Sequence, residues 1–177
     1  MATVRPKTLR NIRDVDRLHS VLQGFIGRKC WQVRFRYGDE LVLHCGRRLS
    51  YHAPQLKHLQ RGEWQFGTRG TAWTLVAPEG EVTSADGDEA TLLPRINILE
   101  GQKITDIAVS SPRNILTITF GKQYFFRVIP TAADDKYDLP YWELFMPDHL
   151  LVSFGPGRQW TLERSDVPMR AKRRSSA

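Results

Sequence analysis

The chain has 177 residues, of which 41% are apolar and 25% are charged, and its formal net charge is +7. This length suits one domain or two very small ones, and the apolar content is high enough to bury a core, so intrinsic disorder is not expected. No apolar run approaches the roughly 20 residues of a membrane-spanning helix, and two cysteines are too few for a disulfide framework.

The N-terminal segment is basic, but the apolar stretch of a secretory signal does not follow it. Two cysteines without a disulfide framework fit a reducing compartment. We therefore expect a cytoplasmic protein that makes no membrane contact.

Residues 1–26 are predicted to form a basic arm followed by an amphipathic helix. Apolar residues recur at steps of three and four, with polar residues between them, at Ile12, Val15, Leu18, Leu22 and Phe25. Gly24 and Gly27 are suitable residues to end this helix. We expect the helix to cover an open end of a β-sheet.

Residues 27–76 are predicted to form a first β-rich repeat. Trp31, Val33 and Phe35 alternate with polar residues, so one face of this strand is apolar. The same alternation returns over residues 41–45, after a sequence that suits a tight turn. A second hairpin completes the unit.

The rest of the chain divides into three segments. Residues 77–98 begin with Gly, Pro and acidic residues and indicate a linker or a long exposed loop. Residues 99–164 show a second series of strand patterns and form the second β repeat. Residues 165–177 form a flexible basic tail.

The two repeats are related by four short blocks that occur in the same order. The matched blocks are 27–35 with 101–109, 41–46 with 116–121, 64–66 with 142–144, and 73–75 with 160–162. A unit of about four strands has one apolar face and open edges, so two units would bury their faces against each other. The predicted fold is mainly β: a duplicated antiparallel β unit packed as a sandwich or barrel, with one N-terminal amphipathic helix.

The second repeat also contains a series of turn and core signatures. These are Leu99-Glu100-Gly101, Leu116 to Gly121, Trp142 to Asp148, and Gly155-Pro156-Gly157. Over residues 99–162 this series resembles an uncharacterised bacterial β-rich domain family that is common in actinobacteria. The chain departs from the family pattern at His149, where Gly is usual, and at Arg158. The resemblance implies a small, cytoplasmic bacterial β domain, and it supplies no activity, cofactor or catalytic residue.

Charge is divided unevenly along the chain. Residues 16–80 carry a net +5 and residues 81–164 a net −4, while both termini are basic. Arg34 and Arg36 alternate with apolar residues and so share the exposed face of one strand. The candidate binding residues are Arg28, Lys29, Arg34, Arg36, Arg47, Arg48, Arg61, Arg69, Arg170, Lys172, Arg173 and Arg174. Aromatic residues near them in the sequence would suit base stacking beside phosphate contacts, namely Trp31, Tyr37, Tyr51 and Trp64.

The spacing of Cys and His residues does not support a metal or catalytic centre. Cys30 and Cys45 correspond to Ile104 and Phe120 in the second repeat, which indicates that both are core positions. His44 is next to Cys45 on a strand and so points to the opposite face, which argues against a shared metal ion. We predict no metal, no cofactor and no catalytic residue.

Three hypotheses of function follow. The first is a non-enzymatic interaction module, of the bacterial accessory or immunity-protein type, that binds another protein. The second is a nucleic-acid-binding protein that uses the basic first half and the basic termini. The third is a hydrolase that uses two carboxylates as acid and base, drawn from Asp134, Asp135, Asp138, Glu143 and Asp148.

Overall fold

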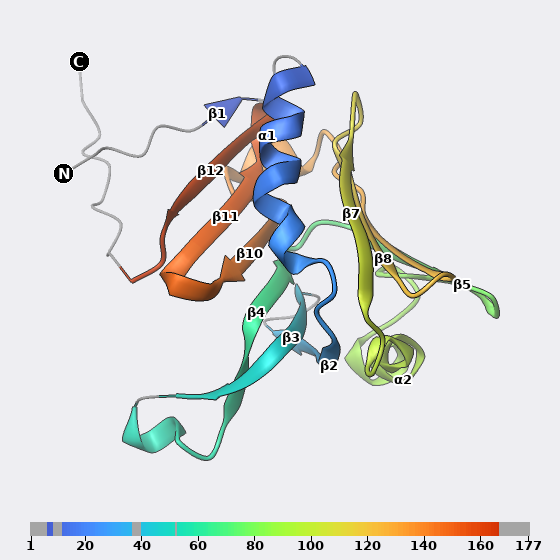
Figure 1. Cartoon of the computed structure of the whole chain (residues 1–177). Coiled ribbons are helices and arrows are strands. Elements are labelled where there is room, and N and C mark those ends of the chain that lie inside the picture. The colour runs from blue at the N-terminus through green and yellow to red at the C-terminus, as the bar shows by residue number, and fades with distance from the viewer. Residues whose placement is uncertain (1–6, 9–11, 37–39, 52, 167–177) are drawn as a thin grey trace.

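The protein is described by a computed structural model over residues 7–8, 12–36, 40–51 and 53–166. The fold is mainly β, with two antiparallel sheets that face each other as a sandwich (Figure 1). The predicted fold class is therefore confirmed. Five of the residues singled out above lie outside the described residues, namely Tyr37, Arg170, Lys172, Arg173 and Arg174.

The larger sheet has seven strands, in the order β1-β12-β11-β10-β4-β3-β2. They span Lys7–Thr8 (β1), Gln159–Arg164 (β12), Leu150–Gly155 (β11), Trp142–Met146 (β10), Gln60–Thr68 (β4), Glu40–Ser50 (β3) and Cys30–Arg36 (β2). The smaller sheet has five strands, in the order β6-β5-β9-β8-β7. They span Gly80–Thr83 (β6), Trp73–Ala77 (β5), Tyr124–Val128 (β9), Ile115–Phe120 (β8) and Ile104–Ser110 (β7).

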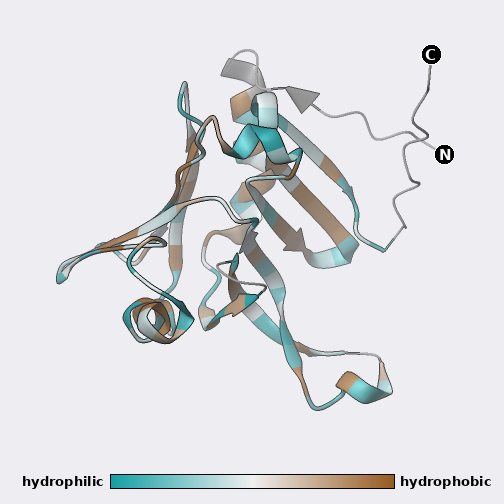
Figure 2. Ribbon diagram, turned by 180° about the vertical axis from the view of Figure 1, so that it is seen from behind, coloured by the Kyte–Doolittle hydropathy of each residue, from teal (hydrophilic) through white to brown (hydrophobic). Residues whose placement is uncertain are grey.

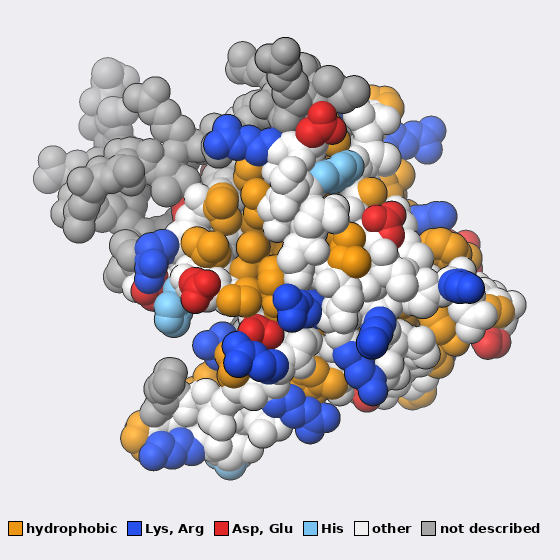
Figure 3. Space-filling model, viewed as in Figure 1, with side chains coloured by type: hydrophobic (Ala, Val, Ile, Leu, Met, Phe, Trp, Pro, Cys, Tyr) orange, Lys and Arg blue, Asp and Glu red, His pale blue; other side chains and the backbone are white. Residues whose placement is uncertain are grey.

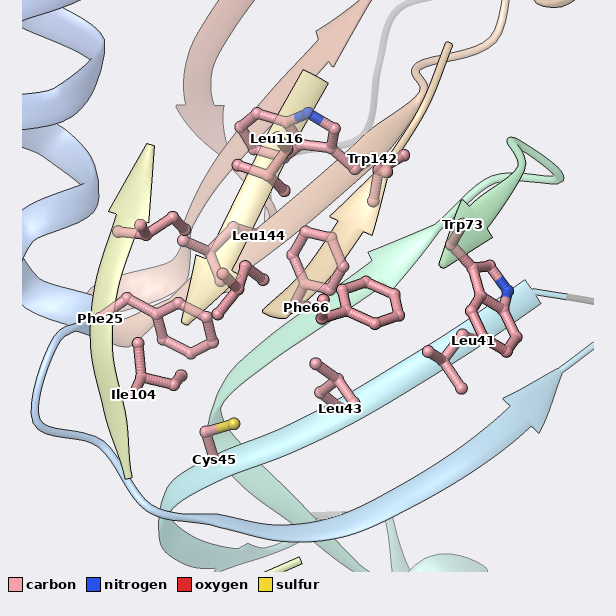
Figure 4. Close-up of a cluster of buried hydrophobic side chains, with 14 of the residues drawn as sticks. Phe25, Leu41, Leu43, Cys45, Phe66, Trp73, Ile104, Leu116, Trp142 and Leu144 are labelled. Carbon is pink, nitrogen blue, oxygen red and sulfur yellow. The ribbon is translucent and has the colours of Figure 1, made fainter. Parts of the chain in front are cut away.

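The core lies between the two sheets and is rich in aromatic rings (Figure 4). Phe66 of β4 meets Phe126 of β9 edge to face, with ring centroids 6.1 Å apart. Each of these rings also packs against a tryptophan of the neighbouring strand: Trp142 lies 6.1 Å from Phe66, and Trp73 lies 5.7 Å from Phe126. All four side chains are almost fully buried, and burial of each large apolar side chain contributes roughly 1.5–3 kcal/mol.

Two α-helices cover the edges of the sheets. They are α1 (Ile12–Leu22), continued by the 3₁₀ helix η1 (Gln23–Phe25), and α2 (Glu89–Ile96), continued by η3 (Asn97–Leu99). Four further 3₁₀ helices lie in the connections: η2 (Pro54–Leu56), η4 (Asp134–Tyr137), η5 (Pro147–His149) and η6 (Pro156–Arg158). None of the described helices is long and apolar enough to cross a membrane.

The edge strands β2 and β7 are each capped by a side chain from the other half of the chain. His19 of α1 accepts a hydrogen bond through Nε2 from the backbone N–H of Val109 in β7, at 3.1 Å. The carboxylate of Glu100, just after η3, accepts one from the backbone N–H of Val33 in β2, at 2.8 Å. Each of these two edges thus has one N–H group occupied, which makes pairing with another chain at that point less favourable.

The two halves of the chain run through the same series of elements. Each begins with a helix and a 3₁₀ helix, continues as a three-stranded meander in one sheet, and then forms a hairpin in the other sheet, to which the second half adds β12. The meander β2-β3-β4 lies in the larger sheet and β7-β8-β9 in the smaller one, so β10 pairs with β4 and β5 pairs with β9. Each sheet is thus built from both halves, because the hairpin of one half pairs with the open edge of the other half's meander.

Backbone hydrogen bonds near the starts of β2 and β7 obey a local twofold relation. The N–H of Gly27 donates to the carbonyl of Ile104 at 2.7 Å, and the N–H of Gly101 donates to the carbonyl of Cys30 at 2.7 Å. Both glycines have positive φ, 82° and 89°, a conformation that favours glycine. These equivalent bonds confirm the first matched block, in which Gly27 corresponds to Gly101.

Strand pairing corrects the later part of the predicted correspondence. Phe66 of β4 occupies the place of Phe126 of β9, because each pairs with the centre of the preceding strand. Trp73 of β5 likewise occupies the place of Trp142 of β10. The last two matched blocks are therefore wrong, since they set β4 against β10 and β5 against β12. Several strands bury a tryptophan and an apolar residue two positions apart on the same face, so this pattern does not identify the strand.

Residues 77–98, expected as a linker or exposed loop, instead contain β6, α2 and η3. The side chain of Asp88 caps α2 by accepting a backbone N–H of its first turn, at 3.0 Å. The buried residues of α2 and η3 are Leu92, Ile96 and Leu99, and they have the same spacing as Leu18, Leu22 and Phe25 before the first meander. Proline within α2 and the Gly-rich approach to it concealed the helix in the sequence.

The halves differ most in two connections. After Gly46, β3 and β4 continue as a protruding hairpin over residues 47–63, which we call the arm (Figures 1 and 2). After Gly121, at the equivalent place in the second half, the chain turns within residues 122–123. The second half instead has a longer link from β9 to β10, residues 129–141, which we call the acidic loop.

Candidate binding surface on the first half

The outer face of the larger sheet brings together four of the predicted arginines. Arg34 and Arg36 project outward from β2, since the residues that alternate with them are buried in the core. Arg48 and Arg61 join them from the two strands at the base of the arm. We call these four residues the basic face. Among the described residues, no salt bridge involves any of them.

A β-bulge shapes the centre of the basic face. The pairing of β2 with β3 shifts between Cys30 and Gln32, so Trp31 is the extra residue of the strand. The indole of Trp31 contacts the imidazole of His44, with ring centroids 5.4 Å apart. The guanidinium of Arg48 lies 4.5 Å from the centre of the Trp31 ring, a distance suited to a cation–π interaction.

His44 is fully buried beneath this face. Its Nδ1 accepts a hydrogen bond from the backbone N–H of Gly62, at 2.9 Å, where the β3–β4 ladder is interrupted. Burial, and then the positive charges of Arg34, Arg36 and Arg61, lower the pKa of His44 from 6.5 to about 3. The imidazole is therefore neutral at neutral pH, and its proton is on Nε2 because Nδ1 accepts a hydrogen bond.

Two of the predicted arginines are already paired with carboxylates. Arg47 forms a salt bridge with Glu63 at 2.7 Å, and hydrogen bonds from Arg47 lower the pKa of that carboxyl. Arg69 forms salt bridges with Glu143 at 2.7 Å and with Glu40 at 3.5 Å. Both arginines are therefore neutralised within the chain, which separates them from the basic face.

Arg28 and Lys29 lie where the two halves meet. Arg28 lies over the ring of Trp64, 5.6 Å from its centroid, and donates a hydrogen bond to the carbonyl of Gly24. Lys29 faces Lys103 in an isolated antiparallel bridge. Figure 3 shows Lys and Arg side chains gathered in the lower half of this view, where the arm and α2 lie. The basic character of the first half thus extends beyond the basic face.

The expected aromatic platform for nucleic-acid bases is only partly present. Trp64 is only 4% exposed and stacks on Phe25 in the core, with centroids 5.6 Å apart. The prediction that Trp64 lies beside a binding face is wrong, because β4 turns this side chain inward. Trp31 does lie on the outer face, but its ring is already in contact with His44 and Arg48.

A shallow groove crosses the outer face next to the basic face. It runs from β2 and β3 across β4 to β10, and the side chains along it include Arg36, Glu40, Val42, Gln65, Arg69, Glu143 and Phe145. Gly67 leaves room at its floor, since the nearest atom to a side chain at this position would be 3.8 Å away. The groove joins the unpaired charge of Arg36 to the ion pairs of Arg69.

The five carboxylates of the hydrolase hypothesis each have a local structural role. Asp134 and Asp135 accept hydrogen bonds from other residues of the acidic loop, and Glu143 pairs with an arginine on the outer face. Asp138 and Asp148 occupy turn positions with φ of 50° and 60°, where Asp is favoured over most residues. Within the described part of the chain, no group of three or more His, Cys, Asp or Glu side chains is arranged to hold a metal ion.

Cys30 and Cys45 are core residues, as the internal comparison predicted. They are paired across β2 and β3 and fully buried. Their counterparts Ile104 and Phe120 are paired in the same way across β7 and β8. Burial raises the pKa of the Cys45 thiol, so this sulfur has little of the thiolate character that a nucleophile needs.

In the second half, the strand pair β7–β8 is equivalent to β2–β3 but has no arginines at the positions of the basic face. Its β7–β8 pair has a bulge at the equivalent place, between Ile104 and Asp106. The counterparts of Trp31, Arg34, Arg36 and His44 are Thr105, Ala108, Ser110 and Thr119. The sequence offers one signal for the role of His44: its counterpart in the second copy is Thr119, so the imidazole serves the first half alone.

Comparison of the chain with protein-family models, with curated proteins and with solved structures gives no significant match. The resemblance of residues 99–162 to a bacterial β-rich family therefore stays a prediction. The basis for assigning a function is the contrast between the two halves of the chain.

Proposed function

We propose that the protein is a non-enzymatic binding module that docks an acidic surface of another protein against its basic face. A role of this type fits bacterial accessory or immunity-type proteins. The observation that carries the proposal is the set of four arginines on one outer face that form no salt bridge among the described residues.

The fold does not require these charges. The second half builds the same strand pair, with the same bulge, from Ala108, Ser110 and Thr119 in place of Arg34, Arg36 and His44. Like charges held close together repel one another and oppose folding. A cluster that the backbone does not need and that carries an energetic cost is best explained by a partner of opposite charge.

Two features favour protein over nucleic acid as the partner. Leu56 and Leu59, at the tip of the arm, are 39% and 40% exposed, and apolar side chains of this kind bury area in protein interfaces. Stacking of bases would need free aromatic rings, whereas Trp31 is engaged by its neighbours and Trp64 is in the core.

The test compares two variants that lose the same charge from different places. The first replaces the basic face (Arg34, Arg36, Arg48 and Arg61, each to Gln), and the control replaces four exposed basic residues of the second half (Lys103, Arg113, Lys122 and Arg127, each to Gln). Each protein is used to isolate a stoichiometric partner from the native host, and binding to a duplex and a single-stranded DNA is measured over a salt series.

The proposal expects the wild type and the control to retain an acidic protein partner and the basic-face variant to lose it. If both variants lost the partner to the same extent, the net charge of the protein alone would account for binding, and the proposal would be overturned. Strong DNA binding that weakens steeply with salt, and that only the basic-face variant loses, would assign the surface to nucleic acid instead.

A further inference from the structure

Three buried N–H groups at the centre of the basic face have no acceptor among the described residues. They are Nε2 of His44, Nε of Arg34 and Nε1 of Trp31. A buried donor without an acceptor costs about 1–3 kcal/mol, so a group of three in one place calls for an explanation.

Core packing does not account for this group. The indole N–H groups of Trp64, Trp73 and Trp142 also lack an acceptor, so an unpaired indole carries little weight by itself. His44 and Arg34 are different, because they project from the outer face and not into the apolar core. His44 is 0% exposed, and its other ring nitrogen is held by the backbone of the arm.

The three donors belong to side chains that are neighbours. The rings of Trp31 and His44 are 5.4 Å apart between centroids. Arg34 pairs with Val42, two pairs along the β2–β3 ladder from the pair of Gln32 and His44, and so lies on the same face of the sheet as His44, at a separation of about 7–8 Å or less for such diagonal positions. Its charge is one of the causes of the lowered pKa of His44.

We propose that Trp31, Arg34 and His44 form a subsite for one oxyanion group, a carboxylate or a phosphoryl group, presented by the docked partner. This inference rests on the proposed function for the source of the oxyanion, but the subsite itself is a property of this chain. An oxyanion supplies several acceptor lone pairs to the three donors. Its charge is balanced by the guanidinium groups of Arg36, Arg48 and Arg61 around it, and charge-assisted hydrogen bonds of this kind are the strong ones.

The test titrates the full chain with inorganic phosphate and, separately, with acetate, against sodium chloride at matched ionic strength. The readouts are the indole N–H resonance of Trp31 in nitrogen-15 NMR spectra, identified with Trp31→Phe, and the midpoint of thermal unfolding. Arg34→Gln is the test variant. Arg127→Gln is the control, because it removes one exposed arginine from the outer face of the other sheet.

We expect a saturable shift of the Trp31 indole resonance and a rise in the unfolding midpoint with an oxyanion but not with chloride. Arg34→Gln should weaken the binding at least about tenfold, as the loss of a charge-assisted hydrogen bond predicts, and Arg127→Gln should leave it unchanged. A response to phosphate alone identifies the partner group as phosphoryl, and a response to acetate as well extends the subsite to carboxylates. Both outcomes support the subsite.

No saturable shift with either anion, or an equal response to chloride, would overturn the subsite. Such a failure is distinguishable from failure of the proposed function. A partner that still requires the basic face would then bind through the exposed guanidinium groups alone. Conversely, if the protein bound an oxyanion but no protein partner were found, the subsite would be supported and the proposed docking function would be rejected.

Discussion

At equivalent places on the first strand pair, the first half of the chain carries Arg34 and His44, and the second half carries Ala108 and Thr119. The backbone beneath them is the same, down to a bulge at the start of the pair. The pairing of the backbone strands therefore does not depend on which side chains project from the outer face of the sheet. Identical ladders accept a charged surface over a buried imidazole in one half and small neutral side chains in the other.

In the core between the two sheets, the two halves place equivalent aromatic residues at equivalent strand positions. Phe66 and Phe126 meet each other, and each packs on the tryptophan of its neighbouring strand, Trp142 or Trp73. Core positions are therefore matched, while surface positions and connections have diverged.

Truncation of the two central rings should have equal effects. Phe66→Ala and Phe126→Ala each remove a fully buried ring and should each destabilise the protein by about 3–5 kcal/mol. Chemical denaturation of both variants measures these losses. If one variant lost less than about 1 kcal/mol, the two rings would not be equivalent and the twofold relation of the core would fail.

Acid should destabilise the first half through His44. Its pKa is about 3 in the folded protein and 6.5 is its ordinary value, so between these values the unfolded chain binds a proton that the folded one does not. The stability contributed by neutral His44 is complete above about pH 6.5 and is lost as the pH falls toward 3, at up to about 1.4 kcal/mol per pH unit.

His44→Gln tests this pH dependence, because glutamine keeps an acceptor for the N–H of Gly62 but does not titrate. Urea unfolding between about pH 4 and about pH 7 should show a flatter pH dependence for the variant than for the wild type. Thr119, the counterpart in the second half, does not titrate, so Thr119→Gln should keep the slope of the wild type. Parallel pH profiles for wild type and His44→Gln would contradict the burial of a neutral imidazole.

The paired glycines should respond alike to a small substitution. Gly27 and Gly101 have positive φ, and a side chain at either would meet no atom closer than 4.0 Å. Gly27→Ala and Gly101→Ala should therefore each cost about 1 kcal/mol from backbone strain alone. Thermal unfolding of the two variants checks this, and a cost at one site only would show that the turns are not equivalent.

Shortening the arm should have the smallest effect on stability. Residues 51–59 lie beyond the last paired residues of the arm, Ser50 and Gln60. Their replacement by Asn-Gly, a two-residue hairpin turn, should change the free energy of unfolding by less than about 0.5 kcal/mol, as for other surface changes. It should also weaken partner binding, since it removes Leu56 and Leu59. Unchanged partner affinity would exclude the tip of the arm from the interface.

Much of the architecture could be predicted, because the spacing of apolar residues along the chain shows which face of a strand or helix is buried. Alternation at Trp31, Val33 and Phe35 predicted β2, although the bulge then turned Trp31 outward. Steps of three and four from Val15 onward predicted α1. The helix α2 was missed, because its proline and the Gly-rich approach resemble a loop, and only its packing against the first half holds Leu92 and similar residues in the core.

The candidate site was predicted only in part. Arg34 and Arg36 could be assigned to one face from strand alternation alone. The sequence could not show that Arg47 and Arg69 are paired with carboxylates and so do not belong to the candidate binding residues, because their partners Glu63 and Glu143 are distant in the sequence or across the sheet. The burial of His44 was equally inaccessible, since it depends on Trp31 and on an arm that is absent from the second copy.

By itself, the sequence determined a mainly β duplicated fold, the apolar faces of its strands and the concentration of positive charge in the first half. These follow from side-chain chemistry and spacing, which act locally. Only the tertiary structure decided that the halves exchange hairpins, that some arginines are paired and others are not, and that the donors of Trp31, Arg34 and His44 lie together. These depend on contacts between residues far apart in the chain, which no local pattern encodes.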